Sequence, residues 1–446
     1  MFIFLSLFVV ILLIIIATVR FKIHPVFSLI IASLVIGFLF GFNTDLIISS
    51  ITEGFGKTLS SIGLVIAFGT TIGVFLEHNG GTKTIAEKIL KIVPVKRSAL
   101  AMNIIGFIIS IPVFCDSGFV ILSSLNKALS KKTGIRLAVF AVALSTGLYA
   151  AHVFIPPTPG PLAAAAVLEA DLGLVMLLGI VVAIPVALTG YLWASFIGKN
   201  IKTDETNSNV DLLEPPISGS NDRNFFLALA PLLLPIILIA LKSFAEYPSH
   251  PFGEGILFDL FVFFGNPIIA LLLGVIFIFV SSKKVGSNTK NEWVLRSLKE
   301  SGSIILVTGA GGAFGNVLRA SELGNMITPG NSYWIGGLLI AFLLAALLKT
   351  AQGSSTVAII TTAAIIAPLL VGFGLESRIE KALSVLAIGA GAMTVSHIND
   401  SYFWVVSQFS HISVKSALKS HTVATLFQGI IGIVVILILQ MLLAEN

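Results

Sequence analysis

The amino-acid sequence predicts an all-α, polytopic integral membrane protein, a helical bundle made of two inverted repeats. Of the 446 residues, 56% are hydrophobic and 11% are charged, and the mean hydropathy is +1.01. Soluble domains have roughly 25% charged residues. Fourteen apolar segments follow one another along the chain, and polar or proline-rich stretches interrupt the apolar pattern at four places. These interruptions predict two re-entrant hairpins and two broken helices.

The charge pattern indicates membrane topology and predicts no nucleic-acid partner. The net charge is +5, and the lysines and arginines gather in a few loops, where they mark the cytoplasmic side. The single cysteine, Cys115, excludes an internal disulfide and a cysteine-rich metal site. Because no phosphate-binding loop motif is present, we predict no cofactor and no ATP-driven motor. The first apolar segment lacks a basic leader region and a cleavage site, so we interpret it as a retained span.

The apolar pattern predicts about ten spans plus two hairpins, because several segments are too short to cross a bilayer core of about 20 helical residues. The fourteen segments are 2–19, 25–42, 59–76, 99–114, 117–128, 137–168, 174–197, 225–242, 257–281, 301–318, 335–348, 356–371, 382–408 and 422–443.

The first repeat, residues 1–197, contains one hairpin and one broken helix. Loops 77–98 and 126–136 are rich in lysine and arginine, so both are predicted to be cytoplasmic. The short segments between them predict a hairpin that enters from the cytoplasm, with its tip at Pro112–Gly118. Further along, four prolines within six residues interrupt segment 137–168 at His152–Pro161, and prolines end a helix there.

Residues 198–224 form the one long polar stretch, which predicts a cytoplasmic linker between the repeats. The second repeat, residues 225–446, shows the same order of features after the basic loop 282–300. A second hairpin, with its tip at Lys349–Thr356, is predicted to enter from outside. A broken helix over 382–408 follows, and the loop 409–421 returns to the cytoplasm.

Matching features of the two repeats lie about 240 positions apart. Asp116–Gly118 corresponds to Gln352–Ser354, and His152 corresponds to His397. Because the two hairpins open to opposite faces, the repeats are predicted to be inverted. Inverted repeats that meet at broken helices near the bilayer midplane are typical of secondary transporters. Four glycines, Gly309, Gly311, Gly312 and Gly315, predict close helix packing and not a dinucleotide loop.

Four short elements therefore converge on one predicted site: 115–118, 152–161, 350–356 and 396–401. Hydroxyls, amides and helix N-termini suit a small polyhydroxylated anion. The candidate substrate-binding residues are Ser117, His152, Thr158, Lys349, Gln352, Ser354, Ser355, Thr356, Ser396, His397, Asn399 and Ser401.

Asp116 and Asp400 are the candidate proton carriers, because ionisable groups inside a membrane usually have a function. The alternatives are structural carboxylates, or proton transfer by His152 or His397 nearer neutral pH. For Lys349, the alternative to a substrate contact is a lysine that snorkels from the hairpin end to the interface. Three further histidines, His24, His250 and His421, lie at loop edges and are expected to be solvated.

The sequence resembles the gluconate permease family of gluconate:proton symporters, which also includes transporters for D-serine and other small hydroxy acids. The likeness covers essentially the whole chain and is carried by Phe114–Gly118, His152–Pro161, Ala351–Ala358 and Ser396–Trp404. The resemblance implies a multi-pass bacterial inner-membrane importer coupled to proton entry, with homodimers and an elevator movement known in the wider superfamily. Lys349 stands where an arginine is expected in many relatives, and the two residues are not interchangeable at a bidentate site.

Two kinds of function therefore remain open from the sequence. The leading hypothesis is a secondary importer of gluconate or a similar sugar acid by proton symport. D-serine, glycerate or another small hydroxy acid is the alternative substrate, with sodium as an alternative coupling ion. In a different class, an intramembrane hydrolase would use Ser355 as the nucleophile and Lys349 as its base, although their spacing does not define such a pair.

Overall fold

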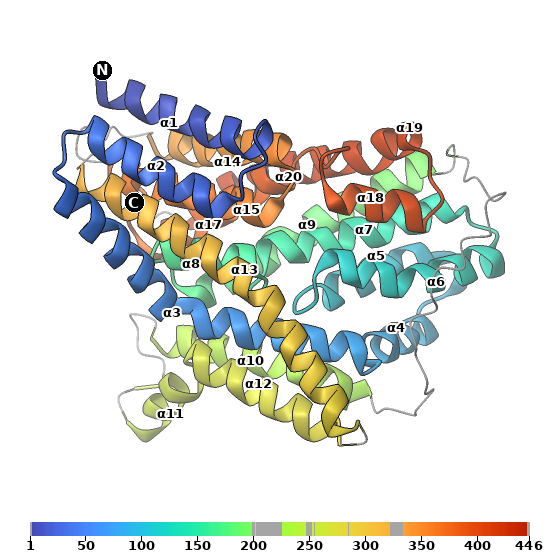
Figure 1. The fold of residues 1–446 in the computed structure, drawn as a ribbon. Helices are drawn as coiled ribbons and strands as arrows, with labels where there is room; N and C mark the ends of the chain where they lie inside the picture. The colour runs from blue at the N-terminus through green and yellow to red at the C-terminus, as the bar shows by residue number, and fades with distance from the viewer. Residues whose placement is uncertain are drawn as a thin grey trace.

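The computed structural model describes residues 2–198, 201, 225–246, 252–253, 255–283, 285–321 and 333–443. Throughout these ranges the regular structure is helical and contains no strand, as the sequence predicts. The helices are long and most run in roughly the same direction (Figure 1). The predicted linker lies outside the described residues except for Gly198 and Ile201, and His250 and Lys284 also lie outside them.

The first half of the chain contributes nine helices to the described part. They are α1 (Phe2–Val19), α2 (Pro25–Leu39), α3 (Thr44–His78), α4 (Gly81–Ile92), α5 (Ser98–Ile109), α6 (Cys115–Thr133), α7 (Leu137–Phe154), α8 (Pro159–Val167) and α9 (Leu172–Ile197).

The second half contributes eleven described helices, two of them a single turn long. They are α10 (Phe225–Ala245), α11 (Ile256–Phe264), α12 (Pro267–Ser281), α13 (Ser287–Ala320), α14 (Tyr333–Gln352), α15 (Ser355–Ile366), α16 (Leu370–Phe373), α17 (Arg378–Met393), α18 (Ser401–Phe409), α19 (Val414–Ala417) and α20 (Val423–Leu443). A π-helical turn, Leu418–Thr422, joins α19 to α20.

Eight helical stretches of the described residues are long and apolar enough to cross a membrane, or nine if α11 and α12 form one bent span. This count takes α7 with α8, α15 with α16 and α19 with α20 as one stretch each. The sequence predicts about ten spans, but α1 and α2 fall among the shorter apolar helices. The predicted apolar segment 257–281 corresponds to two helices, α11 and α12, which meet at an angle of 68°. Asn266 explains the break: its side chain caps α12 by accepting from the Ile268 N–H at 3.0 Å, and Pro267 follows as the first helical residue.

Two predicted loops are largely helical. The loop 77–98 contains α4, whose Ile85 and Ala86 are buried while Lys83 and Lys88 are exposed. This spacing is that of an amphipathic helix, which the basic residues alone do not reveal. The loop 282–300 is likewise helical from Ser287 onward, because α13 extends well beyond its apolar part.

The two longest helices, α3 and α13, pack against each other along much of their length (Figure 1). Their hydroxyls meet at one end, where Thr71 Oγ1 and Ser297 Oγ lie 3.0 Å apart. Toward the other end, a side chain at Gly312 would collide with the Thr58 side chain and with the Gly54 carbonyl. The predicted role of the α13 glycines, among them Gly312, in close helix packing is therefore confirmed, since small residues let two backbones approach.

Helices are interrupted at all four predicted places. The breaks are residues 110–114 between α5 and α6, 155–158 between α7 and α8, 353–354 between α14 and α15, and 394–400 between α17 and α18. Pairs from opposite halves then pack together: α6 contacts α18, and α8 contacts α15. The four breaks and the helix ends beside them contain the residues of the candidate site. Re-entrance of the hairpins and inversion of the repeats remain predictions.

Candidate substrate and proton site

A buried ion pair joins the second hairpin tip to the second broken helix. Lys349, in the last turn of α14, donates from Nζ to Asp400 Oδ2, and the side chains are 1% and 5% exposed. The same Nζ lies 3.4 Å from the Gly353 carbonyl oxygen. A lysine this deeply enclosed does not reach the interface, so the snorkelling alternative is wrong.

Asp400 is held by donors on both carboxylate oxygens. It stands at the N-cap of α18, where Oδ1 accepts from the Tyr402 N–H at 3.0 Å. Oδ2 accepts from Ser396 Oγ as well as from Lys349. A buried carboxylate requires such partners, and the N-terminus of a helix adds a favourable dipole. Asp400, a candidate proton carrier, and Ser396, a candidate substrate-binding residue, therefore belong to a single cluster.

His421 is the functional candidate that sequence reasoning missed. It was expected to be solvated, yet it is fully buried in the π-helical turn before α20. Its Nε2 lies 3.3 Å from Ser396 Oγ, and its Nδ1 lies 3.2 Å from Ser145 Oγ of α7. The available signal was helix continuity: Val414–Leu443 forms one apolar helical stretch, so position 421 lies well inside it. His24, which the sequence predicts to be solvated, is exposed.

Asp116 approaches this cluster from the first repeat. It lies in the first turn of α6, and its charge interacts with those of Asp400 and Lys349. Oδ2 lies 3.9 Å from the Cys115 sulfur, while Oδ1 is buried without a hydrogen-bond partner among the described residues. Both candidate carboxylates and the one candidate lysine are therefore brought together, although they lie far apart in sequence.

The first broken helix contributes two predicted residues with different surroundings. His152, in the last turn of α7, is 6% exposed, and its Nδ1 has no hydrogen-bond partner in the described part. Its ring centroid lies 6.1 Å from that of Phe114 in the first hairpin tip. Thr158 is buried and donates from Oγ1 to the Ile155 carbonyl at 2.6 Å, just before α8 begins.

The second hairpin tip leaves polar groups unused. Both side-chain polar atoms of Gln352 are buried without a partner among the described residues. Ser354 caps α15, accepting from the Val357 N–H at 3.3 Å, and the next two residues, Ser355 and Thr356, are half-buried in the first helical turn. Buried polar atoms normally have partners, so these groups are suited to a hydroxylated ligand.

Four predicted residues lie away from the buried pair. His397 Nε2 and Asn399 Nδ2 lie 3.1 and 2.5 Å from the Thr350 carbonyl oxygen, on the exposed side of the second break. Ser401 is exposed, and Ser117 is half-buried beside Glu77. The matched histidines therefore have different local structures, because His152 precedes its break inside a helix and His397 lies within its own.

Aromatic side chains that sequence reasoning did not select enclose the ion pair. The Tyr402 ring centroid lies 5.2 Å from that of Tyr149 and 6.3 Å from that of Phe119. Tyr402 also donates to the Ser145 carbonyl at 2.9 Å, and Tyr149 donates to the Ala392 carbonyl at 3.3 Å. These hydrogen bonds hold α7 against α17 and α18 beside the cluster.

An apolar helical bundle whose interrupted helices meet at a buried, charged and partly unsatisfied cluster has the features of a membrane transporter. The chain belongs to the GntP family of permeases, whose family model matches residues 1–442. It is a gluconate-type permease and a multi-pass protein of the bacterial inner membrane. The hydrolase hypothesis is wrong, since the family consists of permeases and the Lys349 amine is bonded to Asp400.

Curated relatives match almost from end to end. The chain is 33% identical over 430 residues to a gluconate permease of Pseudomonas aeruginosa, covering 95% of this chain and 94% of that protein. It is 30% identical to the high-affinity gluconate transporter of Escherichia coli, covering 97% and 98%. It is 29% identical to the Gnt-II system L-idonate transporter of the same organism, covering 97% of each chain.

Solved structures share the fold at low sequence identity. MtrF of Neisseria gonorrhoeae, described as one of a class of antimetabolite efflux pumps, superposes with a TM-score of 0.63 at 16% identity, covering 88% of this chain and 83% of that one. The YdaH transporter of Alcanivorax borkumensis gives a TM-score of 0.56 at 15% identity, covering 90% of each. These likenesses support the fold class alone.

Proposed function

We propose that the protein imports gluconate or a similar small sugar or hydroxy acid, together with a proton. The family and the names of its relatives support the substrate class. The observation that carries the coupling is the buried ion pair of Lys349 and Asp400. Lys349 supplies the cation for the carboxylate of a substrate. Asp400 already occupies that cation and must release it before the substrate binds.

Competition between two carboxylates for one lysine couples the substrate to the proton. An unpaired buried charge is costly, so Lys349 keeps one anionic partner at all times. When Asp400 takes up a proton, Lys349 is released to bind the carboxylate of a substrate. The charge of the site is then the same before and after binding. A monoanionic acid and one proton therefore bind together, which is symport with a stoichiometry of one to one.

The hydrogen-bond directions around His421 define a route for that proton. Because Ser396 donates to Asp400, its oxygen must accept from His421 Nε2–H, which assigns the protonated nitrogen of the neutral ring. Nδ1 lies 3.2 Å from Ser145 Oγ, whose hydroxyl donates to the Val142 carbonyl at 3.0 Å. In the imidazolium form both nitrogens donate. His421 can therefore pass a proton to Asp400 through Ser396, from the side of the predicted cytoplasmic loop 409–421.

The remaining candidates are proposed as ligands of the substrate hydroxyls. Gln352, Ser354, Ser355 and Thr356 surround the end of α14 that carries Lys349. Ser117, His152 and Thr158 contribute from the first repeat, and His397, Asn399 and Ser401 contribute from the exposed edge of the second break. Asp116, with one unpartnered oxygen, is proposed as a second carboxylate on the route of that same proton.

Uptake of labelled gluconate into proteoliposomes tests this function. We expect accumulation when an inward proton gradient is imposed at zero sodium gradient, and no accumulation with an inward sodium gradient alone. Unlabelled idonate and glycerate should compete, and an uncharged polyol of the same length should not. Competition by D-serine, with no effect of gluconate, would instead assign the alternative substrate. The homodimer implied by the resemblance also remains a prediction, and light scattering on the purified protein in detergent would measure it.

A further inference from the structure

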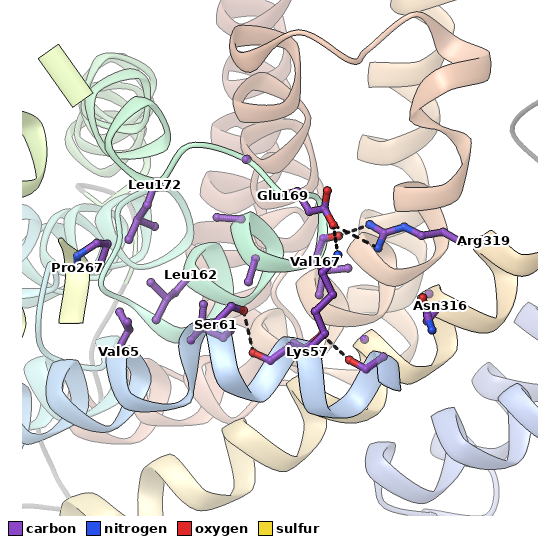
Figure 2. A pocket seen from close by; sticks show the side chains of 18 residues that line it. Lys57, Ser61, Val65, Leu162, Val167, Glu169, Leu172, Pro267, Asn316 and Arg319 are labelled. Carbon is purple, nitrogen blue, oxygen red and sulfur yellow. Dashed lines mark hydrogen bonds and ion pairs between the residues drawn. The ribbon is translucent and has the colours of Figure 1, made fainter. Parts of the chain in front are cut away.

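A cavity that Lys349 and Asp400 do not line lies between α3, α8 and α13. Its volume is about 420 Å³, which is within the range of small-molecule sites. The helix ends around it belong to the face that the positive-inside rule predicts to be external. Figure 2 shows three charged side chains at this cavity: Lys57 from α3, Arg319 from the end of α13, and Glu169 from the loop after α8.

The charges at this cavity are unbalanced in favour of an anion. Lys57 Nζ lies 2.7 Å from Glu169 Oε1, and Arg319 Nη1 lies 3.7 Å from the same oxygen. Arg319 also donates from Nη2 to the Val167 carbonyl at 2.8 Å. The hydrogen bond from Lys57 holds the pKa of Glu169 below its ordinary value, so Glu169 is anionic at neutral pH. Two cations therefore share one carboxylate, and all three side chains are open to solvent.

A separate small crevice lies further along α3 and α8, at the first break. On α3 the cavity is lined from Gly54 to Val65, and the crevice begins one helical turn further, at Gly69 and Thr70. On α8 the cavity is lined by Leu162 to Val167, and the crevice is lined by residues 157–159 at the other end of that helix. The crevice also contacts Phe114, whose ring lies beside His152.

We propose that this cavity is an outer capture site, in which Lys57 and Arg319 bind the carboxylate of a small hydroxy acid before it moves inward. Glu169 occupies the two cations when no substrate is present, and an incoming carboxylate displaces it. Thr58 and Ser61 line the cavity and donate to carbonyls of α3, so their oxygens can accept hydrogen bonds from substrate hydroxyls. The choice of a hydroxy acid rests on the proposed function, whereas anion binding rests on the charges of the cavity.

Charge-selective labelling at Ser61 tests the capture site without requiring transport. Ser61 is exposed and lines the cavity, and the natural Cys115 is buried. In a Ser61→Cys protein, we expect an anionic methanethiosulfonate to react at least about threefold faster than a cationic one of similar size, because a cationic cleft concentrates anions. Adding Lys57→Gln and Arg319→Gln should abolish this preference. Adding Glu169→Gln should increase it, and millimolar gluconate should slow the labelling.

A matched control removes a positive charge at the same end of the molecule but outside the cavity. Lys242 pairs with Glu246, and its neighbour Ser243 donates to Asp171 at the start of α9. Lys242→Gln should leave the labelling preference unchanged. A preference that survives the double charge removal, or that falls equally with Lys242→Gln, would refute the capture site. If the preference falls only with the cavity variants while the wild type transports no gluconate, the anion site stands and the proposed function fails.

Discussion

Asp400→Asn is the sharpest perturbation of the proposed coupling. Asparagine keeps the size of the side chain and an oxygen to cap α18 at the Tyr402 N–H, but it cannot carry the negative charge that holds Lys349. The lysine is then free for the carboxylate of a substrate at every pH. We therefore expect the variant to bind and exchange gluconate but not to accumulate it against a gradient.

The expected pH dependence of gluconate binding follows from the proposed binding of one proton with each substrate. In the wild type, the proposed uptake of one proton with each substrate should weaken gluconate binding by as much as tenfold per pH unit, which corresponds to about 1.4 kcal/mol. Gluconate binding should weaken as pH rises, because the proposed binding step requires the protonated carboxyl of Asp400. In Asp400→Asn the dissociation constant should change less than about twofold per pH unit, since no proton is taken up at this position.

Stability provides an independent check on the same variant. Removing one partner of a buried ion pair costs about 3–5 kcal/mol, because the remaining charge is uncompensated. The double variant Lys349→Gln/Asp400→Asn removes both charges and should recover most of that loss. Thermal unfolding in detergent measures the stability, and calorimetric titration of gluconate from pH 5.5 to 8 measures the binding. Gradient-driven accumulation by Asp400→Asn, with the pH slope of the wild type, would refute the competition between the two carboxylates.

Further predictions concern the other groups of the site and its topology. Lys349→Gln should weaken gluconate binding at least tenfold, about 1.4 kcal/mol, with no effect on the binding of an uncharged polyol. Lys349→Arg should retain partial function. An equal preference for acid over polyol in the wild type and in Lys349→Gln would contradict this prediction. Asp116→Asn should abolish accumulation in proteoliposomes, and full accumulation would leave Asp400 as the sole carboxylate carrier. His421→Gln, which keeps hydrogen bonds but cannot relay a proton, should slow proton-driven uptake at least about tenfold while sparing gluconate exchange, and equal loss of both would indicate a structural role. Single cysteines in residues 77–98 and 126–136 should label from the same side of the membrane, because labelling from opposite sides would make the first hairpin a pair of true spans.

The sequence by itself determined the class of the fold and the places where helices break. Charged residues are too scarce for a soluble chain, and an apolar run shorter than a bilayer core must end, turn or continue as a broken helix. Prolines and polar tips therefore located all four interruptions, because these signals act locally on the backbone. The same local reasoning failed where a polar stretch stayed helical, as in α4 and in the first turns of α13, since amphipathic packing decides those cases.

Only the tertiary structure decided how the polar residues combine. Lys349 and Asp400 lie 51 positions apart, one at the tip of the second hairpin and the other in the second broken helix, so their pairing depends on how α14 packs against α17. His421 joins them because a π-helical turn directs it at Ser396, and neither fact is a property of a short stretch of sequence. The physical reason is that burying a charge is unfavourable unless a partner is enclosed with it. That requirement is satisfied by distant side chains, and the pattern of hydrophobicity along the chain does not specify which ones.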